Sequence, residues 1–148
     1  MAAPGENLRI NADRLWDSIH EIAKIGPGVA GGNNRQTLTD EDGEARRLFR
    51  RWCEEAGLEM GIDKMGTMFA TRAGTDPEAL PVYVGSHLDT QPTGGRYDGV
   101  LGVLGGLEVV RTLNDLGIRT RHPIVVTNWT NEEGTRFAPA MLASGVFA

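Results

Sequence analysis

Two apolar runs that flank one long helical pattern constrain the fold of this chain more than any other feature. Residues 82–86 and 124–129 have the length and composition of buried strands, and residues 100–116 between them repeat apolar side chains at helical spacing. Strand, helix and strand in this order form a βαβ unit, whose crossover makes the two strands parallel. The pattern predicts an α/β domain in which helices flank a mixed, mostly parallel sheet.

The rest of the chain supplies further elements around this unit. Helices are predicted over residues 11–25 and 40–56, the first with Asn11 or Asp13 as its cap and the second with Thr39. Residues 58–62 and 67–72 resemble two short strands that form a hairpin or an adjacent pair. With 148 residues and 40% hydrophobic content, the chain is long enough for one domain with its own core.

Charge and composition argue against several classes of partner. The formal net charge is −5, and acidic residues flank the densest basic run, residues 46–51, which is typical of a solvated helix face. No stretch reaches the ~20 apolar residues of a membrane span. Residues 1–10 lack the apolar centre of a secretory signal. We therefore expect a cytoplasmic protein that binds no nucleic acid and no membrane, with its single cysteine, Cys53, in the core.

Polar residues that can bind metal follow both predicted strands of the βαβ unit. His87 and Asp89 come after the first strand, Asp98 precedes the crossover helix, and the segment Asn-Glu-Glu-Gly (residues 131–134) comes after the second strand. Because parallel strands end at the same edge of a sheet, these residues should converge. Imidazole suits zinc, manganese or cobalt, and bridging carboxylates suit a pair of ions ~3.5–4 Å apart.

The reach of each side chain suggests a role. His87 is the nitrogen ligand, Asp89 is placed to hold its imidazole, and Asp98 could bridge two ions. Adjacent residues in an extended segment point in opposite directions. We therefore expect one of Glu132 and Glu133 to bind metal, while the other faces the attacking water as a general base.

Each of these residues also has a simpler interpretation. A lone histidine at a strand end is more often just hydrogen-bonded, and a pair of glutamates is usually solvated. Their joint placement at one edge, with glycine at position 134 where the backbone must turn tightly, favours a site. His20 and His122 are expected to be structural or exposed. The glycines in residues 99–108 lack the GxGxxG spacing of a dinucleotide site and predict close packing of a helix on the sheet.

Four segments of the chain resemble one protein family. They are GGNNRQTLTDEDGEARRLF, DKMGTMFA, GSHLDTQPTGGRYDGVLGVLGGLEVVRTLND and NWTNEEGTRFAPAMLASGVFA. They are similar to the zinc-dependent amidohydrolases of the hydantoinase/carbamoylase family, which includes N-carbamoyl-L-amino acid hydrolases, β-ureidopropionases and allantoate amidohydrolases. This family belongs to the aminoacylase-like dinuclear metallopeptidases, and the elements HxD, GGxxDG and NEEG in this order are highly specific for it.

The resemblance implies a role for each candidate residue. His87 would bind one metal ion, Asp98 would bridge two ions and Glu133 would bind the second. Glu132 would be the general base, and Asp89 would tune the His87 site. The implied cofactor is a pair of divalent ions, zinc first, with manganese or cobalt as alternatives. The implied reaction is hydrolysis of the carbamoyl or ureido C–N bond of a small molecule such as an N-carbamoyl-L-amino acid, with Glu132 carrying the proton from water to the leaving nitrogen.

One departure from the family pattern limits what residues 1–148 can do alone. The family uses two further histidines and a smaller lid domain that dimerises, and no histidine follows His122 in this sequence. The resemblance therefore implies the N-terminal portion of a catalytic domain, with the lid and dimerisation domain absent and a homodimeric parent. Such a piece is expected to hold metal weakly and to turn over little or no substrate. An aminoacylase, a peptidase or a non-catalytic fragment is the alternative.

Overall fold

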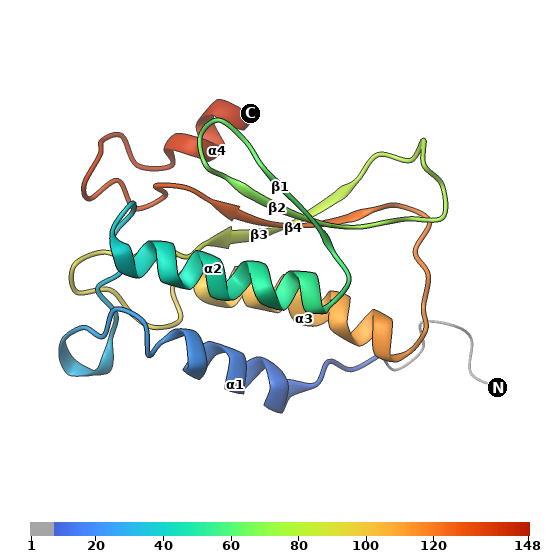
Figure 1. The fold of residues 1–148 in the computed structure, drawn as a ribbon, viewed down its shortest axis with the longest axis horizontal. Helices are drawn as coiled ribbons and strands as arrows, with labels where there is room; N and C mark the ends of the chain where they lie inside the picture. The colour runs from blue at the N-terminus through green and yellow to red at the C-terminus, as the bar shows by residue number, and fades with distance from the viewer. Residues whose placement is uncertain (1–7) are drawn as a thin grey trace.

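A computed structural model of the chain describes residues 8–148, which form one mixed sheet with helices on both sides (Figure 1). The sheet has four strands in the order β1-β2-β4-β3. The elements are α1 (Ala12–Ile22), the 3₁₀ turn η1 (Val29–Gly31), α2 (Asp40–Glu55), β1 (Glu59–Ile62), β2 (Met68–Arg72), β3 (Val82–His87), α3 (Val100–Asp115), β4 (Ile124–Trp129) and α4 (Leu142–Phe147). Most of the N-terminal segment in which no secretory signal was predicted lies outside the described residues.

The strand pairing confirms the predicted βαβ unit. Strands β3 and β4 are parallel and α3 connects them, while β1 pairs with β2 and β2 with β4 in antiparallel fashion. The mixed α/β fold is thus confirmed, although only one of the three pairs in this sheet is parallel. The reason is that β2 ends at the edge where β3 and β4 begin, with Arg72 and Val82 both paired to Ile124. The loop of residues 73–81 therefore reverses the chain, and β2 runs opposite to β3 and β4.

The helices begin where the sequence predicts. Asn11 caps α1 by accepting a hydrogen bond from the backbone of Arg14, and Thr39 caps α2 by accepting one from Asp42 at 3.3 Å. Helix α1 ends at Ile22, three residues before the predicted end, and the chain then turns at Gly26 with φ +64°. Helices α1 and α2 therefore start at side-chain caps, whereas α3 starts behind Gly99 without one.

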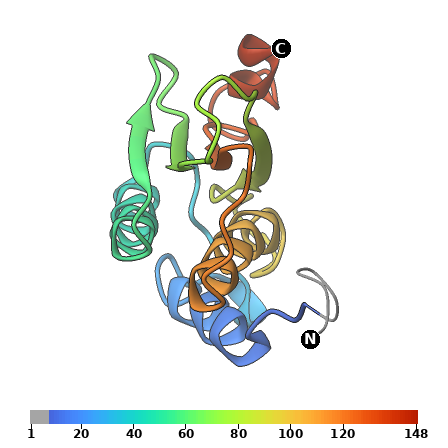
Figure 2. The same cartoon turned by 90° about the vertical axis from the view of Figure 1, so that its right-hand side faces the viewer.

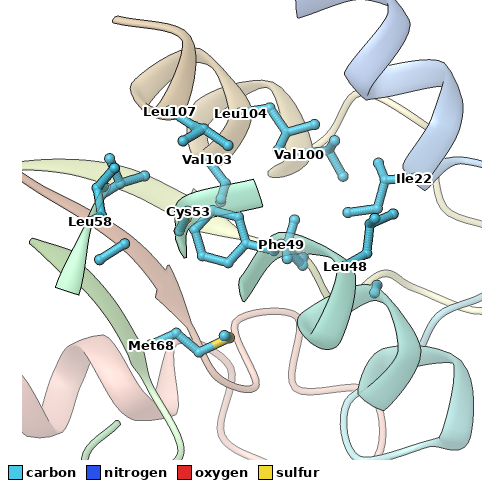
Figure 3. Packing of buried hydrophobic residues seen from close by; sticks show 14 of the residues in the cluster. Ile22, Leu48, Phe49, Cys53, Leu58, Met68, Val100, Val103, Leu104 and Leu107 are labelled. Atoms are coloured by element: carbon cyan, nitrogen blue, oxygen red, sulfur yellow. The ribbon is translucent and has the colours of Figure 1, made fainter. Parts of the chain in front are cut away.

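The core lies between the sheet and helices α2 and α3, which lie side by side against one face, with α1 as a further layer (Figure 2). Phe49 and Cys53 of α2 meet Leu104 of α3 in this core (Figure 3). Cys53 is fully buried, which confirms its expected place in the core. Burial raises the pKa of its thiol to about 12, so the thiol stays protonated. A Cβ atom at Gly106 would lie 3.0 Å from Val84 of β3, so the predicted close packing of helix on sheet is also found.

Arg50 and Arg51 of the basic run lie on an exposed face of α2, as the sequence predicts. Arg50 and Arg51 lie near Glu54 and Glu55 on the exposed side of α2, at 2.8 and 4.0 Å. On the opposite side of the sheet, α4 packs its Phe147 against aromatic side chains of the strands. Among residues 8–148, no helix has the length and apolar content that a bilayer crossing requires.

Candidate metal centre

The candidate site lies at the carboxyl edge of the parallel pair, where the two strands end together. His87, the last residue of β3, pairs in register with Trp129, the last residue of β4. The loops that follow the two strands therefore start side by side (Figure 1). Helix α3 begins at the same edge, behind Gly99, which has φ +67°. A Cβ atom at Gly99 would lie 2.5 Å from the His87 ring, so only glycine allows this approach.

The His87 ring is buried and oriented by the backbone. Its Nδ1 atom lies 2.8 Å from the carbonyl oxygen of Asp89, and only 5% of the residue is exposed. Because a carbonyl oxygen can only accept a hydrogen bond, Nδ1 carries the proton. Nε2 is the remaining ring nitrogen, and it is available as a metal ligand in the neutral imidazole.

The carboxylates of Glu132 and Asp98 lie near this free nitrogen, and Glu133 lies close to His87 and Glu132. Glu132 Oε2 lies 3.3 Å and Asp98 Oδ1 lies 3.9 Å from His87 Nε2. His87, Glu132 and Glu133 each offer one ligand atom, and these atoms lie within 4.8 Å of one another. The unprotonated nitrogen and the carboxylate oxygens can only accept, so nothing among them balances the negative charge. A divalent cation fits this donor set, because it would be bound by the nitrogen and the oxygens together.

The two adjacent glutamates do not diverge as expected. The prediction that one faces away from the other assumed an extended segment, and this assumption is wrong, since the chain after β4 forms turns and Asn131 has φ +58°. In this turn both carboxylates can approach the His87 ring. Gln91 in addition donates a hydrogen bond to Glu133 Oε2 at 2.9 Å. Both glutamates are thus placed to act at a bound ion.

Asp89 joins the two loops rather than holding the imidazole through its carboxylate. Its Oδ1 atom lies 3.8 Å from His87 Nδ1, too far for a hydrogen bond, and its backbone oxygen takes that role. The buried carboxylate instead accepts hydrogen bonds from the backbone amides of Glu132 and Glu133, at 3.3 and 3.2 Å. Asp89 therefore fixes the position of the second loop relative to the first.

The segment before α2 supports the site in a way that sequence reasoning missed. Residues 28–37 have no apolar periodicity, and three glycines and two asparagines in this segment are typical of a loop. In the structure Asn33 and Arg35 of this loop are fully buried. Arg35 exchanges backbone hydrogen bonds with Thr90, with its amide 2.7 Å from Thr90 Oγ1 and its carbonyl 2.8 Å from the Thr90 amide. No sequence signal indicates a buried arginine in an irregular segment.

The two other histidines lie away from this edge. His20 and His122 are exposed or half-buried, and each places its Nδ1 near a backbone carbonyl oxygen, that of Trp16 at 2.9 Å and that of Leu80 at 2.7 Å. Neither belongs to the cluster of potential metal ligands in the described residues. His87 is accordingly the histidine of the candidate site.

Comparison with known proteins gives consistent matches. The sequence profile of peptidase family M20/M25/M40 matches residues 83–148, the part that contains the candidate ligands. The chain is 84% identical over 148 residues to an N-carbamoyl-L-amino-acid amidohydrolase of Rhizobium meliloti, covering all of this chain and 36% of that protein. It is 33% identical over 142 residues to a ureidoglycolate hydrolase of Arabidopsis thaliana, covering 96% of this chain and 30% of that protein.

The fold matches as well as the sequence. The crystal structure of a hydantoinase/carbamoylase family amidase from Burkholderia ambifaria superposes with a TM-score of 0.93 at 57% identity, covering 95% of this chain and 34% of that one. The chain thus spans about a third of the length of the relatives it matches. Sequence and fold confirm the resemblance predicted from the motifs, and the chain is a member of the hydantoinase/carbamoylase family.

Proposed function

We propose that this chain forms part of the catalytic centre of a metal-dependent amidohydrolase that hydrolyses the carbamoyl C–N bond of N-carbamoyl-L-amino acids. One observation carries the proposal: His87 presents Nε2 to Glu132 and Asp98, at 3.3 and 3.9 Å, at the carboxyl edge of the sheet. The 84% identity to an N-carbamoyl-L-amino-acid amidohydrolase supports this choice of substrate.

The proposed cofactor is a pair of divalent ions, zinc first, with manganese or cobalt as alternatives. His87 would hold one ion and Glu133 the other, with Asp98 between them. A bound divalent ion polarises a carbonyl group and can lower the pKa of water from 15.7 to about 7. The arrangement of one imidazole and three carboxylates supports this ligand set.

The chain's own residues would carry the proton. Glu132 would accept a proton from the attacking water, whose oxygen forms a bond to the ureido carbonyl carbon. The C–N bond to the amino-acid nitrogen then breaks, and Glu132 returns the proton to that nitrogen. Asp89 would keep Glu132 in place, because its carboxylate accepts the backbone hydrogen bond of that residue at 3.3 Å.

A related ureido substrate is the second candidate. The ureidoglycolate hydrolase of Arabidopsis thaliana is 33% identical to this chain, and the bond its name implies is also a ureido C–N bond. Residues around His87 act on the reacting carbonyl, so the same set could serve either substrate. We further propose a cytoplasmic enzyme that works as a homodimer with a lid domain, and little or no turnover by residues 1–148 alone.

A chimeric enzyme tests the proposal. The 148 residues would replace the matching segment of the Rhizobium meliloti relative, and the zinc-loaded chimera would be assayed on N-carbamoyl-L-amino acids, ureidoglycolate and N-acyl amino acids. We expect release of the L-amino acid from the N-carbamoyl compounds at the highest kcat/KM. A chimera that cleaves only N-acyl amino acids or peptides would contradict the assignment, and one that holds metal but cleaves nothing would favour the non-catalytic alternative.

A further inference from the structure

Arg35 is a charged residue in the interior of the protein, close to the candidate metal centre. None of its surface is exposed, and among the described residues it forms no ion pair with a carboxylate within 4.0 Å. Burial of a charge is costly unless hydrogen bonds satisfy it. Burial accordingly lowers the pKa of Arg35, and the carboxylates of Asp42 and Asp89 oppose this shift. A buried apolar side chain would avoid this desolvation cost. The role of the guanidinium therefore lies in the hydrogen bonds that it forms.

The contacts of the guanidinium run directly to the loop that carries the candidate ligands. Nε donates to the carbonyl oxygen of Leu88 at 2.8 Å, and Leu88 lies between His87 and Asp89. Nη1 donates to the carbonyl oxygen of Ile25 at 2.8 Å and to that of Ile22, the last residue of α1, at 3.4 Å. The carbonyl groups at a helix C-terminus carry partial negative charge, which suits a cation. Arg35 thus ties the ligand loop to the end of a helix.

The backbone of Arg35 also forms hydrogen bonds to Thr90, at the other end of the same loop. The Arg35 amide and carbonyl both bond to Thr90, at 2.7 and 2.8 Å. The amide of Leu88 is held in turn by Asn128 Oδ1 of β4, at 2.9 Å. The stretch from Leu88 to Thr90 is therefore fixed from two sides. Within it, the Asp89 carboxylate accepts hydrogen bonds from the backbone amides of Glu132 and Glu133, in the loop after β4.

We propose, on the basis of the function proposed above, that Arg35 is a positioning residue that holds residues 88–90 so that His87 and Glu132 meet at the metal centre. The planar guanidinium donates in two directions at once, to Leu88 and to Ile25. A lysine has a single nitrogen at the end of a flexible stem and cannot bridge these two carbonyl groups in the same geometry. A positive charge at position 35 is therefore insufficient to hold the loop without the planar guanidinium.

The variant Arg35→Lys tests the proposal in the chain itself, with Arg72→Lys as a matched control. Arg72 also donates to a backbone carbonyl, that of Ile118 at 2.6 Å, and to Asn114 at 2.9 Å. It pairs with Ile124 at the start of β4, so it lies at the opposite edge of the sheet. If Arg35→Lys does not fold, Thr90→Val takes its place, because it removes the acceptor of the Arg35 amide.

Two measurements separate positioning from general stability. In the metal-free protein, we expect amide hydrogen exchange at Leu88, Thr90, Glu132 and Glu133 to be at least about tenfold faster in Arg35→Lys and unchanged in Arg72→Lys. With Co²⁺ as the probe, followed by its visible absorption, we expect about 10–100-fold weaker binding in Arg35→Lys and the wild-type affinity in Arg72→Lys.

The outcomes distinguish this proposal from the proposed function. Exchange rates that stay at the wild-type value in Arg35→Lys would overturn the positioning role, and so would equal losses of Co²⁺ affinity in both variants. A wild-type chain that binds no Co²⁺, with exchange still faster in Arg35→Lys, would count against the metal centre and would support the positioning role.

Discussion

The half-buried Arg14 and the buried Arg35, both near α1, differ in how many of their hydrogen bonds are formed. Arg14 forms an ion pair of 2.7 Å with Glu108, whose carboxylate also accepts from the Asn11 amide and from Thr112 Oγ1. The Arg35 guanidinium donates only to backbone carbonyl groups, and its Nη2 atom has no hydrogen-bond partner among the described residues. The Glu108 carboxylate thus has several hydrogen-bond donors, whereas one nitrogen of the Arg35 guanidinium is left without an acceptor.

This difference separates a stabilising cluster from a functional one. The Glu108 cluster fastens α1 to α3, and every contact it makes is between those elements or their ends. The contacts of Arg35 are directed to a loop that carries candidate metal ligands. Proteins tolerate incompletely satisfied groups mainly at functional sites. We therefore expect changes around Glu108 to affect stability and changes at the carboxyl edge to affect chemistry.

The largest expected effect follows from Glu132→Gln in the zinc-loaded chimera. Loss of a general base lowers kcat by about 10²–10⁴-fold. The amide keeps the size of the side chain, so we expect an unchanged metal content and an unfolding temperature within about 2 °C of the wild type. Steady-state kinetics, metal analysis and calorimetry measure these quantities. A kcat equal to that of the wild type would remove Glu132 from the assigned role.

The converse substitution, Glu108→Gln, should affect stability instead. It leaves Arg14 without the buried half of its pairing, while Asp115 at 2.8 Å remains as an exposed partner. We expect the free energy of unfolding to fall by about 2–3 kcal/mol, with kcat per folded molecule of the chimera unchanged. Urea titration of the 148-residue chain measures the first quantity. A loss below about 0.5 kcal/mol would show that the pair is not stabilising.

Acid should abolish the contribution of Glu108. Burial alone would raise the pKa of this carboxyl, but hydrogen bonds from Arg14 and Thr112 lower it below its ordinary value of 4.5. A pKa that is lower in the folded than in the unfolded chain gives stability above the unfolded pKa, which is lost as pH falls through the folded pKa. We expect the stability difference between wild type and Glu108→Gln to be constant near neutral pH and to shrink below pH ~4.5. Urea titrations at several pH values measure it, and a difference that grows with acid would contradict this sign.

The smallest expected effect concerns two neighbouring glycines of α3. A Cβ atom at Gly105 would meet no atom within 4 Å, whereas one at Gly106 would lie 3.0 Å from Val84 and 3.2 Å from Val126. We expect Gly105→Ala to raise the free energy of unfolding by about 0.5–1 kcal/mol, with Co²⁺ affinity unchanged. Gly106→Ala should lower stability, because the methyl groups of Val84 and Val126 must move to make room. Urea titration of both variants measures the free energy of unfolding. A loss of stability in Gly105→Ala would contradict the open space around this position.

The parts of the fold that depend on periodicity could be predicted from sequence. Residues 82–86 and 124–129 are apolar over strand length, and the parallel crossover between them brings their ends to one edge. That rule predicts that the loops carrying His87 and Glu132 meet at one edge, and the two side chains lie 3.3 Å apart there. Thr39 and Asn11 were recognisable as caps because their side chains satisfy exposed backbone amides.

The remaining features depend on backbone conformation that periodicity does not report. Asn131 adopts φ +58°, and this single turn brings Glu132 and Glu133 to the same side. The Asp89 backbone, rather than its carboxylate, orients the imidazole. Arg35 contacts Leu88 across 53 positions of sequence, and no local pattern encodes such a contact. These features depend on long-range packing and loop conformation, which a local sequence pattern does not specify.

Nitrogen NMR of the three histidines during zinc titration tests the central claim most directly. We expect the Nε2 resonance of His87 to shift on zinc binding while Nδ1 keeps its proton, because Nδ1 is bonded to the Asp89 carbonyl oxygen at 2.8 Å. The resonances of His20 and His122 should not move. If zinc shifts either of these two and leaves His87 unchanged, the metal centre is not at the carboxyl edge of β3 and β4.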